Sequence, residues 1–381
     1  MNNQAKRVEY LDSIRGLASL FVLFSHTIGA FAWPDTIARI CTLPFLIIFF
    51  DGKAAVAMFF VLSGFVLSRP YVSSEAPEKQ RKIFLPTFYL RRITRIWFPW
   101  FFAFCLSILF QKFCFYRVSS TPPISQWLDQ FWHAPLTASD FFRQCLFLLH
   151  DSSRQLLNQD WSLGIELKGS FLIPVFLVLL RGQRLPWFMG LAGLFCVFVH
   201  TGHYYVSFML GVLIAQYGKS LSHFWINRKR TVPIGMFLLG LSLYQSYHYI
   251  VSFFGETDQA LKIGWLGTAL GCSLILLSAL NSSRLQSLLN HKPVVFIGKI
   301  FYSVYLLQFV VILCLLPPAM HLLNNCGITQ FTLLFALSLI FSTGITIALA
   351  TLSYQFIESP AINLGHFLSK RLQCRFDKSG R

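Results

Sequence analysis

Two polar residues stand out in the first long apolar stretch of the chain. From Ser13 to Phe31 the sequence is almost wholly apolar, yet it contains Arg15 and His26, eleven positions apart. Eleven residues are close to three turns of α-helix, so both side chains point the same way, about 16 Å apart along the axis. A polar stripe on an apolar helix must face a protein interior or a wet cavity. An Arg that snorkels to lipid headgroups and a His bonded to a neighbouring helix would give the same pattern.

A carboxylate lies in a later apolar stretch that begins at Asp160 and Trp161. Trp161 suits the outer interfacial belt, which places Glu166 about 7 Å further inward. A buried carboxylate is costly unless it is paired or protonated, so Glu166 indicates either a partner or a function. Because a His–carboxylate pair is a common general base, we predict that Glu166 orients or charge-stabilises His26. The alternative is a structural ion pair, although Lys168 diverges from Glu166 by about 200° on a helix.

Basic and hydroxyl side chains form two further candidate groups. Arg91, Arg92 and Arg95 open the third apolar span. Arginine forks suit the phosphates of a nucleotide-bearing donor, but arginines here would equally anchor a span to anionic lipid. In a later span, Tyr302 and Tyr305 are spaced by three, in a position to line a cavity.

The composition points to a membrane protein. Of 381 residues, 55% are hydrophobic and only 12% are charged, which is outside the range of soluble globular proteins. The net charge of +17 does not indicate nucleic-acid binding, because the basic residues lie in loops between apolar spans. The nine cysteines contain no Cys-x-x-Cys, so we expect neither a disulfide framework nor a metal site.

Windows of apolar sequence predict an all-α, polytopic fold of about ten transmembrane helices. Basic residues alternate with acidic ones between successive loops, which places both termini in the cytoplasm. We divide the chain into a cytoplasmic segment 1–13, a membrane domain 14–357 and a basic cytoplasmic tail 358–381. The predicted spans are 14–33, 53–70, 95–115, 161–180, 186–201, 203–217, 232–252, 261–280, 293–316 and 328–355.

Three local expectations accompany these spans. Ser63 and Gly64 are small residues that favour close packing by a neighbouring helix. The long loop 116–160 faces outward and contains Trp127, an aromatic suited to lying along the interface. Pro360 is expected to end the last helix, with Glu358 in a salt bridge to a basic loop.

The ordered motifs make the chain similar to the membrane-bound acyltransferase-3 family. Where that family often has a His three positions after the second Tyr of its Tyr-Ser-x-Tyr-Leu motif, this chain has Gln308, which cannot shuttle a proton. The motifs that carry the resemblance are Leu11-Asp12-Ser13-Ile14-Arg15-Gly16 continuing to His26, Phe59-Phe60-Val61-Leu62-Ser63-Gly64-Phe65, Arg91-Arg92-Ile93-Thr94-Arg95-Ile96, Trp161-Ser162-Leu163 with Glu166, Tyr302-Ser303-Val304-Tyr305-Leu306, and Tyr354 with Ile357-Glu358-Ser359-Pro360.

The resemblance implies a multi-pass O-acyltransferase of the bacterial inner (cytoplasmic) membrane. An acyl group, with acetyl expected, would move from acyl-CoA to a hydroxyl of a surface polysaccharide, glycolipid or similar acceptor, without a metal. His26 would act as general base or carry the acyl group transiently, Glu166 would support it, and Arg15 would reach the donor from the inner side. The residues expected to bind the donor are Arg91, Arg92, Arg95 and Tyr302. Besides acyl-CoA and acceptor, the lipid bilayer is the expected partner, and nucleic acid is not.

Two other classes of function fit the same residues. A transporter or flippase of a glycan or lipid would use the polar stripe as a permeation path, although no inverted repeat is evident. A membrane scaffold would tolerate substitution of Arg15, His26 and Glu166 together. Dependence on acyl-CoA separates the enzyme from both.

Overall fold

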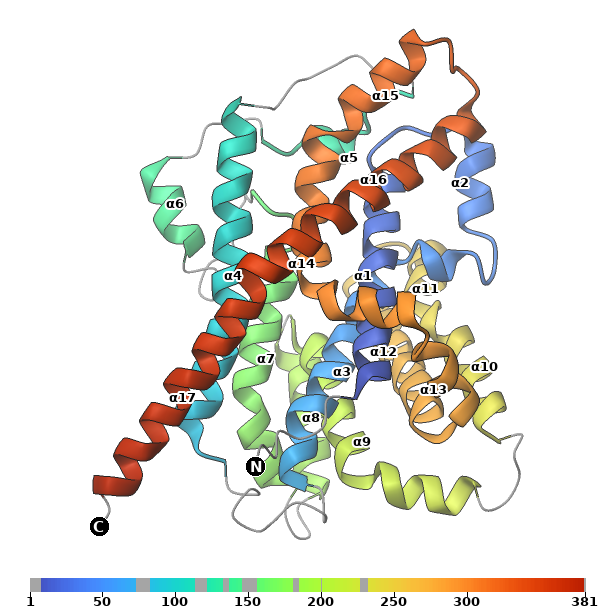
Figure 1. Ribbon diagram of the computed structural model, residues 1–381. Helices are drawn as coiled ribbons and strands as arrows, with labels where there is room; N and C mark the ends of the chain where they lie inside the picture. Colours follow the sequence, from blue (N-terminus) through green and yellow to red (C-terminus); the bar gives the residue numbers. More distant parts are fainter. Residues whose placement is uncertain are drawn as a thin grey trace. The chain divides into compact units, whose positions relative to one another are not determined.

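In the residues that it describes, the computed structural model has helices (Figure 1) and one isolated antiparallel bridge, between Phe31 and Ile124. Six helices of this described part are long and apolar enough to cross a membrane. The predicted all-α membrane class is confirmed, whereas the count of ten spans and the cytoplasmic termini stay predictions. Parts of the N-terminal segment, the outer loop 116–160 and the C-terminal tail lie outside the described residues. The described residues are 8–72, 83–113, 122–132, 137–145, 156–180, 185–199, 201–226 and 232–379.

The helices form two compact units, and three helices contribute to both. The shared helices are α1 (Glu9–Gly29), α7 (Asp160–Leu179) and α14 (Lys292–Cys314). The first unit comprises residues 1–18, 53–85 and 168–299. Its own helices are α3 (Gly52–Val72), α8 (Leu185–Phe198), α9 (Gly202–Ile226), α10 (Val232–Tyr244), α11 (Ser246–Phe254), α12 (Asp258–Asn281) and α13 (Ser283–Leu289).

Small residues bring helices of the first unit into backbone contact. A side chain at Gly64 of α3 would collide with the carbonyl of Phe208 in α9, and one at Gly211 of α9 would collide with the carbonyl of Val61. Without a hydrophobic force between helices in lipid, such close approach is a main source of association. The predicted packing role of the Ser63–Gly64 pair is therefore confirmed.

The predicted span 232–252 is two helices, α10 and α11, separated at Gln245. The hydroxyl of Thr268 in α12 donates to the carbonyl of Tyr244 at 3.2 Å and accepts from the amide of Tyr247 at 3.0 Å. One buried side chain thus satisfies backbone groups that the break would otherwise leave unpaired.

The second unit comprises residues 19–52, 86–167 and 300–381. Polar pairs join its helices: Thr27 to Ser342 at 3.1 Å, and the Trp100 indole to Asp160 at 2.7 Å. Its own helices are α2 (Asp35–Cys41), η1 (Ile47–Phe49), α4 (Leu85–Phe113), α5 (Gln126–Asp129), α6 (Ala138–Cys145), α15 (Leu316–Asn325), α16 (Phe331–Ser353), the π-helical turn η3 (Tyr354–Glu358) and α17 (Ser359–Ser379).

The expectation that the last helix ends at Pro360 is wrong. The helix runs from α16 through the π-helical turn η3 into α17, as the red ribbon in Figure 1 shows. Proline lacks the N–H that an α-helix bonds four residues back, and its ring crowds that carbonyl. A wider π turn directly before the proline relieves both demands, so the helix continues.

Candidate functional site

His26 of α1 lies among side chains from three other segments of the second unit. Its ring stacks on Trp127 with centroids 5.5 Å apart and contacts the edge of Phe309 at 6.0 Å. The side-chain nitrogen of Asn158 lies 3.4 Å from His26 Nε2. His26 Nδ1 is buried and has no hydrogen-bond partner among the described residues. Nε2 therefore faces a polar side chain, whereas Nδ1 faces none within the described residues.

Trp127 reaches His26 because its loop is fastened to the end of α1. Ser125 donates its hydroxyl to the carbonyl of Gly29 at 2.5 Å, and its amide donates to Ala30 at 2.9 Å. The same hydroxyl caps α5 by accepting from the amide of Leu128 at 3.1 Å. A serine at the N-cap starts the short helix at a fixed point, which directs Trp127 over the histidine ring.

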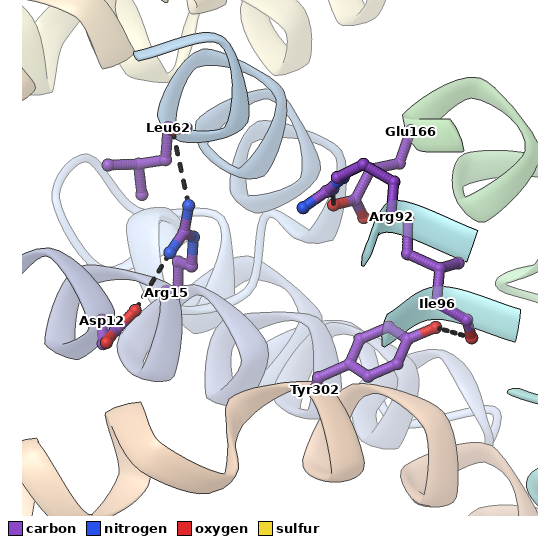
Figure 2. A network of polar contacts seen from close by, with 7 residues as sticks. All are labelled: Asp12, Arg15, Leu62, Arg92, Ile96, Glu166 and Tyr302. Atoms are coloured by element: carbon purple, nitrogen blue, oxygen red, sulfur yellow. Dashed lines mark hydrogen bonds and ion pairs between the residues drawn. The ribbon is translucent and has the colours of Figure 1, made fainter. Parts of the chain in front are cut away.

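Glu166 of α7 pairs with Arg92 of α4, at 3.2 Å between Oε1 and the guanidinium (Figure 2). The predicted support of His26 by Glu166 is not what the structure forms, because His26 makes no hydrogen bond or ion pair with a carboxylate within the described residues. The Arg92 side chain is 10% exposed and that of Glu166 is 21% exposed. Each charge compensates the other in a poorly solvated setting.

Burial and pairing separate the three arginines of α4. Arg92 is buried and turned to Glu166, while Arg91 is exposed and Arg95 is partly buried. On a helix both Arg91, four positions away, and Arg92, three positions away, could share a face with Arg95, so the ion pair with Glu166 is what sets Arg92 apart. The structure therefore brings Arg91 and Arg95 together and leaves Arg92 out of that group.

Tyr302 and Ser303 fix α14 to its neighbours in the second unit. The Tyr302 hydroxyl donates to the carbonyl of Ile96 in α4 at 2.8 Å (Figure 2), and the Ser303 hydroxyl donates to Glu358 at 2.7 Å. Glu358 is 1% exposed, and the hydrogen bond that it accepts comes from a buried hydroxyl of α14, where a salt bridge to a basic loop was expected. Tyr302 thus reaches the turn of α4 that follows Arg92.

Arg15 belongs to the first unit. Its guanidinium donates to Asp12 at 3.0 Å and to the carbonyl of Leu62 in α3 at 3.5 Å (Figure 2). Nearby, a side chain at Gly16 would lie 2.6 Å from the backbone nitrogen of Gly298, so α1 and α14 touch there. Arg15 is 7% exposed and links α1 to α3 at this crossing.

The contacts of three polar residues at the start of α7 were not predicted from the sequence, although Asp160 was named there as the beginning of the apolar stretch. Asn158 meets His26, Gln159 donates to the carbonyls of Tyr305 and Leu306 at 3.2 and 2.7 Å, and Asp160 accepts from Trp100. The available signal was the uninterrupted polar run Asn158-Gln159-Asp160 at the mouth of an apolar span. Within the described part of the chain, no group of three His, Cys, Asp or Glu side chains is placed to hold a metal ion.

A protein-family model matches most of the chain. Residues 8–351 match the acyltransferase domain of the acyltransferase-3 family. Because the match covers most of the chain, the protein belongs to that family and is a membrane acyltransferase. Neither a curated protein nor a solved structure matches it.

Proposed function

We propose that the protein transfers an acyl group, most simply acetyl, from acyl-CoA to a hydroxyl of a surface polysaccharide, glycolipid or similar acceptor. The observation that carries the proposal is the buried Nδ1 of His26, which meets no hydrogen-bond partner in the described part of a chain that belongs to an acyltransferase family. A base that must deprotonate a hydroxyl needs a lone pair held in place and shielded from water. Trp127 and Phe309 supply the shielding.

In the proposed reaction, His26 Nδ1 takes the proton of the acceptor hydroxyl as its oxygen attacks the thioester carbonyl. The new C–O bond forms, the C–S bond breaks, and the leaving thiolate takes the proton from the imidazolium. Alternatively, the imidazole nitrogen attacks the thioester carbonyl first, the C–S bond breaks and the thiolate leaves; the acceptor oxygen then attacks the acyl-imidazolium, the N–C bond breaks, and the hydroxyl proton neutralises the thiolate. Asn158 lies at Nε2, on the far side of the ring from the reacting atom in either route.

The other predicted residues receive distinct roles in this proposal. Arg91 and Arg95 bind the donor's phosphates, for which guanidinium forks are suited. Arg92 holds the carboxylate of Glu166, and Tyr302 holds the adjacent turn of α4. Arg15 sets the register of α1 through Asp12 and Leu62.

The test is a His26→Ala variant supplied with radiolabelled acetyl-CoA in membranes that contain the native acceptors. Loss of a general base lowers the transfer rate by about a hundredfold or more. The melting temperature of the purified variant should stay near that of the wild type. His321→Ala is the matched control, since His321 bonds to Asn325 on α15.

If His26→Ala transfers the label as fast as the wild type, His26 is not the general base. If the wild type moves a glycan or lipid across the bilayer without acyl-CoA and leaves it chemically unchanged, the protein is a transporter. A trapped acyl-histidine after rapid quenching would select the two-step route.

A further inference from the structure

The face of α4 that carries Arg91 and Arg95 is packed against α17. A side chain at Gly365 would collide with the hydroxyl of Thr94 and would lie 3.7 Å from the Cα of Arg91. One turn further along α17, Ser369 donates its hydroxyl to the carbonyl of Thr87 at 3.4 Å. Two small residues thus let the helices touch, and Figure 1 shows them side by side.

This contact places a third basic side chain beside the two arginines. His366 directly follows Gly365 and is exposed, and Arg91 and Arg95 are the charged groups that act on it electrostatically. Neither arginine forms an ion pair with a carboxylate among the described residues, in contrast to Arg92 with Glu166. The like charges of Arg91 and Arg95 repel one another unless an anion binds between them.

The length of the last helix indicates where Arg91, Arg95 and His366 lie relative to the hydrocarbon core. The continuous apolar helix spans Phe331–Phe376, 46 residues or about 69 Å, against a hydrocarbon core of about 30 Å. One end of the helix therefore extends beyond the hydrocarbon. The end with the basic residues His366, Lys370 and Arg371 is the less costly one to place in the headgroup region or in water.

We propose that Arg91, Arg95 and His366 form a phosphate-binding surface shared by α4 and α17. Two guanidinium forks and an imidazole N–H provide several directed donors, which match the oxygens of a phosphate ester. The phosphate has two possible sources: the coenzyme A portion of the donor, which rests on the proposed function, or the headgroup of an anionic phospholipid, which does not.

The experiment uses the full-length protein in nanodiscs, with coenzyme A as the first probe and phosphatidylglycerol as the second. In phosphatidylcholine discs, calorimetry gives the dissociation constant of coenzyme A for wild type, Arg91→Ala/Arg95→Ala and His366→Ala. Losing one charge-assisted hydrogen bond weakens binding by about tenfold or more. In the second arm, the rise in melting temperature on adding phosphatidylglycerol is measured without coenzyme A.

The matched control is Arg371→Ala. Arg371 is another exposed cation of α17, and its guanidinium lies 4.4 Å from the ring centroid of Phe367. His366→Lys, which keeps a cationic donor, should recover binding that His366→Ala loses. A purely structural role for His366 would not give that recovery.

Each outcome has a defined meaning. Weaker coenzyme A binding in both variants, with the control unchanged, supports the surface with the donor as ligand. Loss of the lipid-induced rise alone supports it with a headgroup as ligand. If neither arm separates the variants from Arg371→Ala, the proposal is overturned. A wild type that binds no coenzyme A but keeps the lipid response contradicts the proposed donor and leaves the surface standing.

Discussion

The two ring nitrogens of His26 have different surroundings and therefore different roles in the proposed reaction. Asn158 faces Nε2, while Nδ1 is buried and has no partner among the described residues. An amide offers a ring nitrogen either its NH₂ group or its oxygen, and each choice fixes one tautomer of neutral histidine. For Nδ1 to accept a proton, Nε2 must carry one, so the amide of Asn158, whose nitrogen faces Nε2 in the structure, must turn its oxygen to Nε2 during the reaction. Asn158 is then a positioning residue for His26.

This argument predicts different results for two substitutions at Asn158. Asn158→Asp keeps an oxygen toward Nε2 and should retain most of the transfer rate. Asn158→Leu removes the acceptor and should lower kcat by about tenfold or more with little change in KM, because the wrong tautomer becomes populated. Steady-state kinetics with acetyl-CoA checks both. Equal loss in the two variants would show that the amide donates to Nε2 instead.

The Arg92–Glu166 pair gives a second prediction, for stability. Replacing only Glu166 by Leu leaves a poorly solvated guanidinium without its counter-charge and should cost about 2 kcal/mol. Arg92→Met/Glu166→Leu removes both charges and should cost less than the single change. Thermal unfolding of wild type, both single variants and the double variant completes the cycle. Additive losses would mean that the two side chains do not interact.

Part of the arrangement of these side chains could be predicted from the sequence. Helix periodicity predicts that Arg91 and Arg95 share a face of α4, but it allows Arg92 to share a face with Arg95 as well. The partner of Glu166 did not follow, because Arg92 lies 74 positions away and periodicity says nothing about which helices meet. The neighbours of His26 come from α5, α14 and the turn before α7, which no local pattern joins.

At the level of the helices, contacts that depend on glycine give a prediction for stability. Gly64→Ala would drive a methyl group into the backbone of Phe208, which cannot move as a side chain tip can. We expect a loss of at least about 2 kcal/mol in stability. Gly344→Ala is the control, since nothing lies within 4 Å of an added Cβ and alanine favours the helix. Melting temperatures should fall for the first and stay or rise for the second.

The positions of the helices were largely predictable, whereas their interruptions were not. Each predicted span overlaps a helix, and the span 232–252 overlaps two, since long apolar runs in a membrane protein leave the backbone little choice. The break at Gln245 depends on Thr268 of another helix, and the turn before Pro360 depends on local widening. Neither has a signature in hydropathy.

At the scale of the whole molecule, the prediction concerns the orientation of the chain in the membrane. With both termini cytoplasmic, Cys374 faces the cytoplasm and Cys326, between α15 and α16, faces outward. Both are exposed, whereas Cys272 is buried. In single-cysteine variants, a membrane-impermeant maleimide should label Cys326 in intact cells and Cys374 only after permeabilisation. Cys272 is the unreactive control, and the reverse pattern would invert the proposed topology.

The π-helical turn η3 gives the C-terminal helix a register of its own. Such a turn is equivalent to a one-residue insertion in a continuous α-helix. Winding the same residues as a regular α-helix would shift every later side chain by one position, a rotation of about 100°. Gly365 would then leave the face toward α4, and His366 would leave Arg91. The width of this one turn therefore decides which side chains of α17 meet α4.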